Sequence, residues 1–563
     1  MNICKKDFRS AYLALLSVLF LSGCATYNQN ISDGRELAQQ GQWHEAEEVI
    51  TEALDGSQNH LLRLLEAGAL AQYQGEFERS NQLLEQAEKL SDTFLEESIS
   101  SRSWSLLANP MQGDFQPSGF ERVYINFFKS LNYLALADQS TNRRERQNLL
   151  DAALIEARRI DIKLNEIAAI TPSYEDIDGD NKAFLSKAVD WLSGFYTGGI
   201  HSDDFAYRDD AWARYIEGLQ YELSGEYDDA RIAYQAAAEL YDKGYSKQYN
   251  LPADASQRAW LDTIRMMKKG GGWQSEYPAL AKKKLNKDYQ ALLAEYDSKA
   301  AEIIVIEEQG FMPERKELNL MLYASPNSYS LVLEPFYTGS HQDANNASRW
   351  FSMVYADQGL LNLFANYQAG GAWNTFAGVF TKRIILGNAG WRSLSSLGID
   401  KMLYEAPVRV AVPYYDPYVL DSSETKLSSS LTDAVAAKNK AVRMTSLADI
   451  SIQVQLSQSS RDIYETLLRE LLRNYLAYKV TSEVQDETAS LLLGLVGKIA
   501  VLASASSESR NWSSLPAQIR LTRQAANTGQ QTLNYKAGEQ NFTLEEFSLN
   551  KNQIKVWNIR NPN

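Results

Sequence analysis

The sequence predicts an α+β protein with more than one domain: a helical half, residues 24–300, and a mixed α/β half, residues 301–563. Three observations predict this. A motif recurs in the first half, apolar residues at helical spacing surround it, and short alternating runs bounded by glycine and proline follow residue 300. The 540 residues that follow a leader segment are enough for two or more hydrophobic cores.

The helical half is predicted from an internal repeat. The stretch Gly41-Gln-Trp-His-Glu-Ala recurs 34 residues later as Gly75-Glu-Phe-Glu-Arg-Ser, and again as Gly225-Glu-Tyr-Asp-Asp-Ala. This pattern resembles the tetratricopeptide repeat (TPR), a pair of antiparallel helices in which glycine ends the first helix and small residues let the helices approach closely. We therefore predict a TPR-like α-solenoid over residues 24–300. Three unrelated amphipathic helix pairs are the alternative.

The second half is predicted to combine strands with one long helical stretch. The helix is expected over 461–503, where its apolar end is too short for a transmembrane helix and contains Lys498, so a buried core helix is favoured over membrane contact. Residues 338–400 cannot be assigned from the pattern. Strands are expected at 303–306, 317–323, 329–334, 408–412, 450–456, 515–521, 532–535, 542–549 and 553–559.

The first 23 residues have the composition of a signal peptide. Three basic residues precede an apolar run over 11–21, which ends in Leu21-Ser-Gly-Cys24. This ending resembles the lipobox of bacterial lipoproteins, which implies that the Cys24 thiol receives diacylglycerol with palmitate-type acyl chains and that the leader is cleaved just before Cys24. Ala25 stands where an aspartate retains such proteins at the inner membrane, which implies an outer-membrane lipoprotein on the periplasmic face. An ordinary signal peptide with an accidental cysteine is the alternative.

Charge and cysteine content restrict the partners of the mature chain. Cys4 is removed with the leader, so no disulfide is expected within the chain and stability depends on packing. Removal of residues 1–23 leaves 53 basic and 70 acidic residues, a net charge of −17. Nucleic acid is a poor partner for such a surface. The expected membrane contact is through the acyl chains on Cys24.

No catalytic, metal or cofactor motif is recognised. The four histidines have no metal-ligand spacing, and the Asp176–Asp180 stretch lacks the glycine and glutamate of a calcium loop, so we interpret it as a solvated loop. No phosphate-binding loop or nucleophile elbow occurs, and Gly270-Gly-Gly is interpreted as a hinge. We expect no cofactor and no enzymatic activity, although a glycosidase carboxylate pair has no sequence signature.

Several short sequence segments resemble segments of an uncharacterised family of proteobacterial lipoproteins with TPR-like repeats. They lie at 120–125, 131–136, 156–161, 308–316 and 510–519. In this comparison residues 338–400 are an insertion. The resemblance implies an envelope lipoprotein and carries no established activity.

The expected function is that of a membrane-anchored periplasmic adaptor or scaffold that binds another envelope protein through its helical repeats. A peptidoglycan- or glycan-binding or glycan-acting protein, and a structural subunit of an envelope assembly, are the alternatives. In TPR proteins the first helix of each pair lines the concave face, and packing against a neighbouring helix or the second domain is the other interpretation of these positions. The expected partner-binding residues are Leu62, Leu65, Tyr73, Trp212 and Tyr215.

Overall fold

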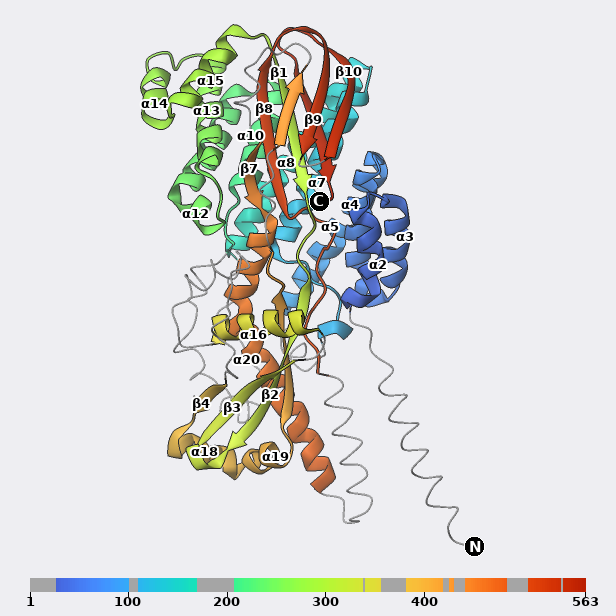
Figure 1. The fold of residues 1–563 in the computed structure, drawn as a ribbon, viewed down its shortest axis with the longest axis vertical. Helices are drawn as coiled ribbons and strands as arrows, with labels where there is room; N and C mark the ends of the chain where they lie inside the picture. The colour runs from blue at the N-terminus through green and yellow to red at the C-terminus, as the bar shows by residue number, and fades with distance from the viewer. Residues whose placement is uncertain are drawn as a thin grey trace.

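The computed structural model describes residues 27–100, 110–169, 207–337, 340–355, 381–418, 425–429, 441–482, 505–537 and 540–563. The described chain forms an elongated α+β body (Figure 1), as the sequence predicts. Helices cover one face of a four-stranded mixed sheet at one end, and a four-stranded antiparallel sheet with helices packed on it forms the other end. The predicted signal peptide, Cys24, the Asp176–Asp180 loop and the apolar run after residue 482 lie outside the described residues.

The first half of the chain folds into successive antiparallel helix pairs, each packed on the next. The turn glycines Gly41, Gly75 and Gly225 adopt φ values of 76°, 80° and 82°, which an L side chain rarely takes. The repeat motif therefore marks real helix ends. The pairs are α2 (Tyr27–Gln39) with α3 (Trp43–Ala53), α4 (His60–Tyr73) with α5 (Phe77–Ser100), α7 (Gly119–Gln139) with α8 (Arg143–Ala169), and α10 (Ala211–Ser224) with α11 (Tyr227–Leu240).

A second glycine in each repeat permits close packing of its two helices. A Cβ atom on Gly68 would lie 2.7 Å from the Leu84 side chain, and one on Gly218 would lie 2.7 Å from the Tyr234 ring. The first copy has the same arrangement between Gly34 and Ile50, at 2.5 Å. Helices this close leave no space for a methyl group. The three copies are thus equivalent in local geometry, and the Gly34 position extends the sequence motif.

The helical region ends in a layer that covers the upper sheet. This layer contains α12 (Ser246–Gln248), α13 (Ala253–Gly270), α14 (Tyr277–Lys284) and α15 (Lys287–Ser298). Helix α13 packs on α11 and carries Trp260, Ile264 and Met266 into the core. The Gly270–Gly272 tract ends α13, with Gly271 and Gly272 at positive φ.

The upper sheet is mixed and has the strand order β11-β1-β8-β7. Strand β1 runs parallel to β11 and antiparallel to β8. Its side chains alternate: Ile304 and Ile306 face the helical core, while Ile303 and Val305 pack with Tyr535 on the other side. That side meets a three-stranded sheet of order β10-β9-β6. The strands are β1 (Ala301–Gln309), β6 (Thr425–Ser429), β7 (Val442–Ser446), β8 (Gln518–Ala526), β9 (Gly529–Ala537), β10 (Gln540–Leu549) and β11 (Ile554–Asn561).

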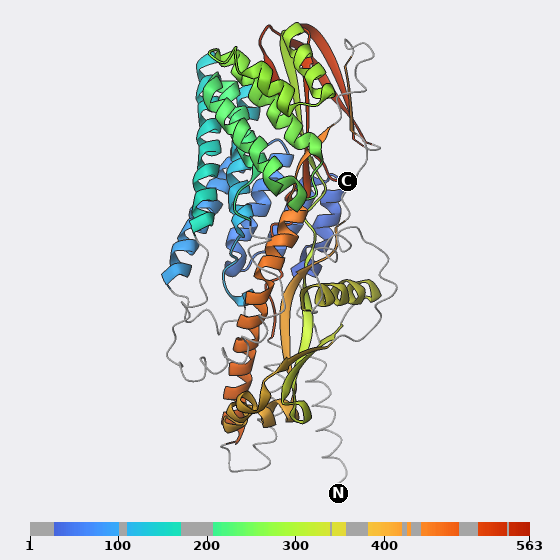
Figure 2. The ribbon, with the colours of Figure 1, turned by 90° about the vertical axis from the view of Figure 1, so that its left-hand side faces the viewer.

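The lower unit is an antiparallel sheet of order β4-β3-β2-β5 with helices packed on it. Figures 1 and 2 both place it at the opposite end of the body from β9 and β10. Helix α20 runs between the two ends (Figure 2), because Ile450 belongs to the upper core while Ile463 and Leu467 belong to the lower one. The elements are β2 (Arg315–Ser325), β3 (Ser330–Phe336), α16 (His341–Tyr355), β4 (Lys382–Ile385), α18 (Gly387–Ser396), α19 (Ile399–Glu405), β5 (Val408–Tyr415) and α20 (Leu447–Ser482).

Most predicted elements are confirmed, and one prediction is wrong. Residues 450–456 form part of helix α20 and not a strand. Their alternating sequence misleads because Ser451, Gln453 and Gln455 are buried along with the apolar residues, so this part of the helix has no polar, solvent-exposed face that would produce a helical period. Residues 341–355 and 381–400, unassigned from sequence, contribute α16, β4, α18 and the start of α19 to the lower unit.

The largest apolar core crosses the predicted domain boundary at residue 300. It contains side chains of the helix pairs together with Ile304, Ile306, Ile519 and Leu521 of the upper sheet. The helix pairs therefore bury much of their apolar surface against the second half of the chain. Whether residues 24–300 fold alone stays a prediction.

Candidate functional site

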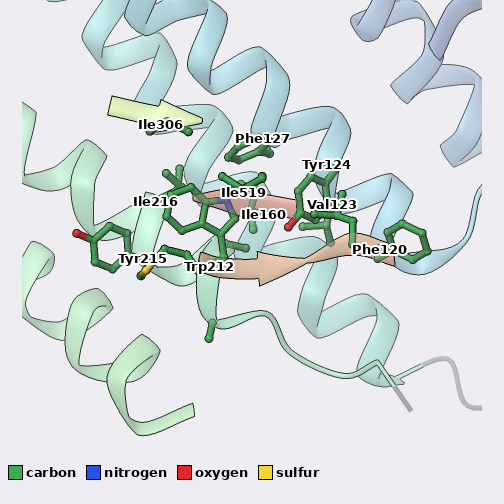
Figure 3. Close-up of a cluster of buried hydrophobic side chains, with 14 of the residues drawn as sticks. Phe120, Val123, Tyr124, Phe127, Ile160, Trp212, Tyr215, Ile216, Ile306 and Ile519 are labelled. Carbon is green, nitrogen blue, oxygen red and sulfur yellow. The ribbon is translucent and has the colours of Figure 1, made fainter. Parts of the chain in front are cut away.

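The side chains predicted to form an open binding face lie in the interior. Leu62, Leu65, Trp212 and Tyr215 have no exposed surface. Figure 3 shows Trp212 enclosed by helices and by strands of the upper sheet, with its ring stacked on Tyr215 at a centroid distance of 5.6 Å. The expectation of an open face at these positions is therefore corrected. Packing against neighbouring elements, the alternative interpretation, is what the structure shows.

The fifth residue, Tyr73, contacts a segment of the same chain. Its hydroxyl donates a hydrogen bond to the carbonyl oxygen of Ser514, at 2.9 Å. The Tyr27 hydroxyl donates to the carbonyl of Asn511, also at 2.9 Å. Residues 508–515, which we name the inner segment, thus lie against the first helices of the first two pairs. The inner face of the helix array is occupied by its own chain.

Two buried glutamates hold the backbone of the inner segment. Glu66 of α4 accepts hydrogen bonds from the backbone N–H groups of Ser513 and Ser514, at 2.6 and 3.1 Å. Glu121 of α7 accepts from the N–H of Trp512 with one oxygen, while its other oxygen caps the first turn of α7 at Ser118. Burial raises the pKa of both carboxyl groups. Their function is structural, because each accepts from main-chain N–H groups that have no other acceptor among the described residues.

Arg510 fixes the start of the inner segment. The guanidinium has no exposed surface and donates to the carbonyl oxygens of Gln58, Pro110 and Gly113, at 3.1, 3.1 and 2.9 Å. It also donates to Asn59 Oδ1 and pairs with Glu508 at 2.6 Å. A planar fork with five donors suits such a set of acceptors. The inner segment is therefore locked to the α3–α4 connection and to the residues that precede α7.

A second buried cluster joins the helical layer to the upper sheet. Arg523 of β8 pairs with Glu222 of α10 and Glu302 of β1, and Arg265 of α13 pairs with Glu302 and with Asp262 at 2.6 Å each. Arg258 pairs with Asp262 from the other side, at 2.7 Å.

Three guanidinium groups surround three carboxylates in this cluster, and the Lys269 ammonium also pairs with Glu222, at 2.6 Å. Burial raises the pKa of Glu222, Asp262 and Glu302, but the guanidinium charges outweigh it and hold each pKa below its usual value. A carboxylate that stays ionised and fully paired is not poised for acid–base catalysis near neutral pH. The cluster therefore holds two layers together.

One open groove lies on the outer side of the helix pairs. Helix α7 forms its floor, and helices α5 and α8 form its walls. The cavity volume is about 960 Å³, at the upper end of the range for ligand sites. We name it the α5–α7–α8 groove. Its lining residues are Glu78, Asn81, Gln82, Glu85, Lys129, Tyr133, Leu136, Gln139, Ser140, Thr141, Glu145, Leu149, Ala152, Ile155, Glu156 and Arg159.

One end of the groove is closed by an ion-pair network. Lys129 of α7, with a side chain only 1% exposed, pairs with Glu85 and Glu88 of α5 and with Glu156 of α8, at 2.6, 2.7 and 3.1 Å. Arg159 contacts the same three carboxylates. These pairs bridge helices α5 and α8, which define the walls. We call this the ion-pair end, and the end at the α7–α8 turn the turn end.

The ion-pair network shifts the pKa values of its members in opposite directions. Burial raises the pKa of Glu88, but the charges of Lys129 and Lys163 outweigh it and bring the value to about 2. Burial lowers the pKa of Lys129, but Glu88 and Glu156 outweigh it and the net shift is upward. Glu88 and Lys129 are therefore both charged at neutral pH. The network can fix helices and present charge, but it has no proton to transfer there.

Within the described ranges, no group of three histidine, cysteine or acidic side chains is arranged to hold a metal ion. No helix in the described residues is long and apolar enough to cross a bilayer. The proposed lipid position, Cys24, lies outside these residues. Comparisons with protein-family models, with curated proteins and with solved structures gave no match to this chain.

Sequence reasoning missed the groove, although one signal for it is present. Lys129 interrupts the apolar face that runs from Tyr124 to Leu134, and a lysine on a buried helix face requires carboxylate partners. The partners could not be assigned, because acidic residues are frequent on every helix of this region. Ile155 could not be recognised as a groove residue either. A single exposed isoleucine on a helix is common, and it indicates a binding surface only when it lies beside a cavity.

Proposed function

We propose that this chain is an envelope lipoprotein, anchored through acylated Cys24 at the periplasmic face of the outer membrane, that acts as a protein-binding adaptor. Its helix pairs serve as a TPR-like scaffold, and the α5–α7–α8 groove is its partner site. The observation that supports this most is the contrast between two surfaces of the same helices. The inner face is filled by residues 508–515, whereas the outer groove is open and lined by both apolar and charged side chains.

The anchor assignment has a direct test in Cys24→Ser. The substitution removes the thiol that the lipobox-like sequence marks for acylation. We expect the variant to take up no labelled fatty acid and to leave the membrane fraction or retain its leader. Continued incorporation of the label would contradict the anchor.

The adaptor function is tested by crosslinking in the cell envelope. A photoreactive amino acid in place of Ile155, which is 50% exposed on the groove wall, should give a specific adduct with one envelope protein. The matched control is Ile232, 55% exposed on α11 and outside the groove lining. A shared set of adducts at both positions, or none at Ile155, would contradict partner binding in the groove. Crosslinks to glycan strands would favour the glycan-binding alternative, and adducts only between copies of this chain would favour an assembly subunit.

A further inference from the structure

The charges of the groove differ between its two ends. At the ion-pair end Lys129 and Arg159 are neutralised by three glutamates that they contact directly. At the turn end Glu78 and Glu145 are exposed. Glu145 accepts a hydrogen bond from the Ser140 hydroxyl, at 2.8 Å. The lining as a whole carries four carboxylates against two cations, a net charge of −2 on an acidic chain. An anionic ligand is disfavoured here, and a cationic one is attracted.

An apolar strip runs beside these carboxylates. Tyr133 and Leu136 of α7 line the floor of the groove, and Leu149, Ala152 and Ile155 of α8 line the adjoining wall. Ile155 is half exposed, although burying an isoleucine side chain stabilises by about 1.5–3 kcal/mol. A strip bordered by charge fits the face of an amphipathic segment, which places apolar and polar side chains on opposite sides.

One nitrogen donor of a buried amide on the groove wall has no hydrogen-bond acceptor among the described residues. Asn81 of α5 is 8% exposed, and its Oδ1 accepts a hydrogen bond from Asn132 Nδ2 at 2.9 Å. Its own Nδ2 has no hydrogen-bond acceptor among the described residues. An unpaired buried donor costs about 1–3 kcal/mol. Because this nitrogen has no accessible surface, the amide belongs to the interior of the groove wall and is not a contact for a ligand.

We propose that the α5–α7–α8 groove binds a basic amphipathic segment of a partner protein. Its apolar side chains pack on the strip formed with Ile155, and its lysines or arginines pair with Glu78 and Glu145. This inference rests on the proposed adaptor function and specifies the chemistry of the partner. The open shape of the groove suits a stretch of polypeptide, which can leave the cavity at the turn end.

The test uses designed peptides and the mature chain carrying Cys24→Ser, which needs no detergent. Three fluorescent peptides of about 18 residues, long enough to form a helix, are compared. The first peptide forms a helix with leucines on one face and lysines on the other. The second has glutamate in place of each lysine. The third has the same amino acids as the first in scrambled order, so that it forms no amphipathic helix. Binding is measured by fluorescence anisotropy. We expect saturable binding of the first peptide alone, weakened as salt rises from about 50 to about 300 mM because the charges are exposed.

Groove variants and matched controls locate the binding. Glu78→Gln with Glu145→Gln, and separately Ile155→Ser, should each raise Kd about fivefold or more, while the melting temperature stays unchanged. The controls are Asp228→Asn with Asp229→Asn, and Ile232→Ser, all on α11 and outside the groove lining. They should leave Kd unchanged. Equal binding of the acidic or scrambled peptide, or equal effects of control and groove variants, would overturn the proposal.

Crosslinking at position 155 with and without the competing peptide tests the two proposals separately: that the chain is an adaptor, and that its partner presents a basic amphipathic segment. Crosslinking of one envelope protein from position 155, competed by the basic amphipathic peptide, supports both proposals. The same crosslink without competition by that peptide overturns the partner class and leaves the adaptor function standing. Peptide binding without any crosslinked envelope protein overturns the adaptor function.

Discussion

Two surfaces of the same helix array differ in how their polar groups are paired. On the inner face, Glu66 and Arg510 contact main-chain groups of the protein itself, and nearly all of these atoms are buried. On the outer side, the α5–α7–α8 groove combines a neutralised ion-pair end with exposed carboxylates at its turn end. A face whose donors and acceptors are satisfied within the chain stabilises the fold. A face with open apolar and charged groups is available to a partner.

Among the variants that test this difference, the largest loss of unfolding free energy is expected at the inner face. Arg510→Ala removes the guanidinium from three carbonyl oxygens and leaves Glu508 without its partner. Loss of one member of a buried pair costs about 3–5 kcal/mol, and the extra unsatisfied carbonyls place this variant at the upper end. Urea denaturation measures the loss. Arg63→Ala, at a 44% exposed side chain paired with Asp55, is the control and should change stability little.

Trp212→Ala tests whether a predicted binding residue is part of the core. The ring has no exposed surface, and removal of a buried tryptophan costs about 3–5 kcal/mol. We expect a clear fall in melting temperature. Tyr404→Ala, at a 73% exposed ring on α19, is the matched control. A Trp212→Ala variant with unchanged melting temperature and weakened partner capture would restore the open-face interpretation.

The ion-pair end of the groove should show its structural function in acid. The Glu88 pKa lies at about 2 in the folded protein, below its ordinary value of 4.5, so the carboxylate stabilises the fold above pH 4.5 and this contribution is lost as pH falls toward 2. The loss is about 3 kcal/mol at most. Glu88→Gln should flatten the dependence of unfolding free energy on pH in this window. Glu166→Gln, 45% exposed, is the control, and equal profiles for both variants would contradict the assignment.

The smallest effect on stability is expected at the turn end. Glu78→Gln and Glu145→Gln change exposed carboxylates, so each should alter the unfolding free energy by less than about 0.5 kcal/mol. Thermal denaturation measures this. A larger loss would show that the turn end is part of the folded framework, and would remove the distinction between the two surfaces.

Much of the fold could be predicted because it depends on local sequence. The turn glycines mark helix ends, and strands such as β1 and β11 are apolar or alternating runs between turn residues. Strand β7 was missed, because its five residues, Val-Arg-Met-Thr-Ser, have neither a continuous apolar run nor flanking turn residues. Residues 450–456 were predicted as a strand because polar and apolar residues are buried alike in this part of helix α20, so the sequence has no helical period there.

The candidate site could not be predicted from the same signals. Placing Leu62 and Tyr73 on an inner face was sound for an isolated repeat. What covers that face is a segment more than 400 residues later in the chain, as the Tyr73–Ser514 hydrogen bond shows. A separation of this length leaves no periodic trace in sequence. The pairing of Lys129 with three glutamates from two helices likewise depends on how the helix pairs stack.

The position of Tyr27 determines how the proposed lipoprotein stands on its membrane. This residue is already buried and hydrogen-bonded to Asn511, yet it follows the proposed lipid-bearing cysteine by only three residues. Three residues of extended chain reach about 11 Å at most. A linker of this length keeps the folded protein close to the membrane surface if Cys24 is lipidated. If the proposed anchor and the proposed partner site are both correct, the stack from α2 to α8 sets the height of the groove above the bilayer, and a partner has to present its segment at that height.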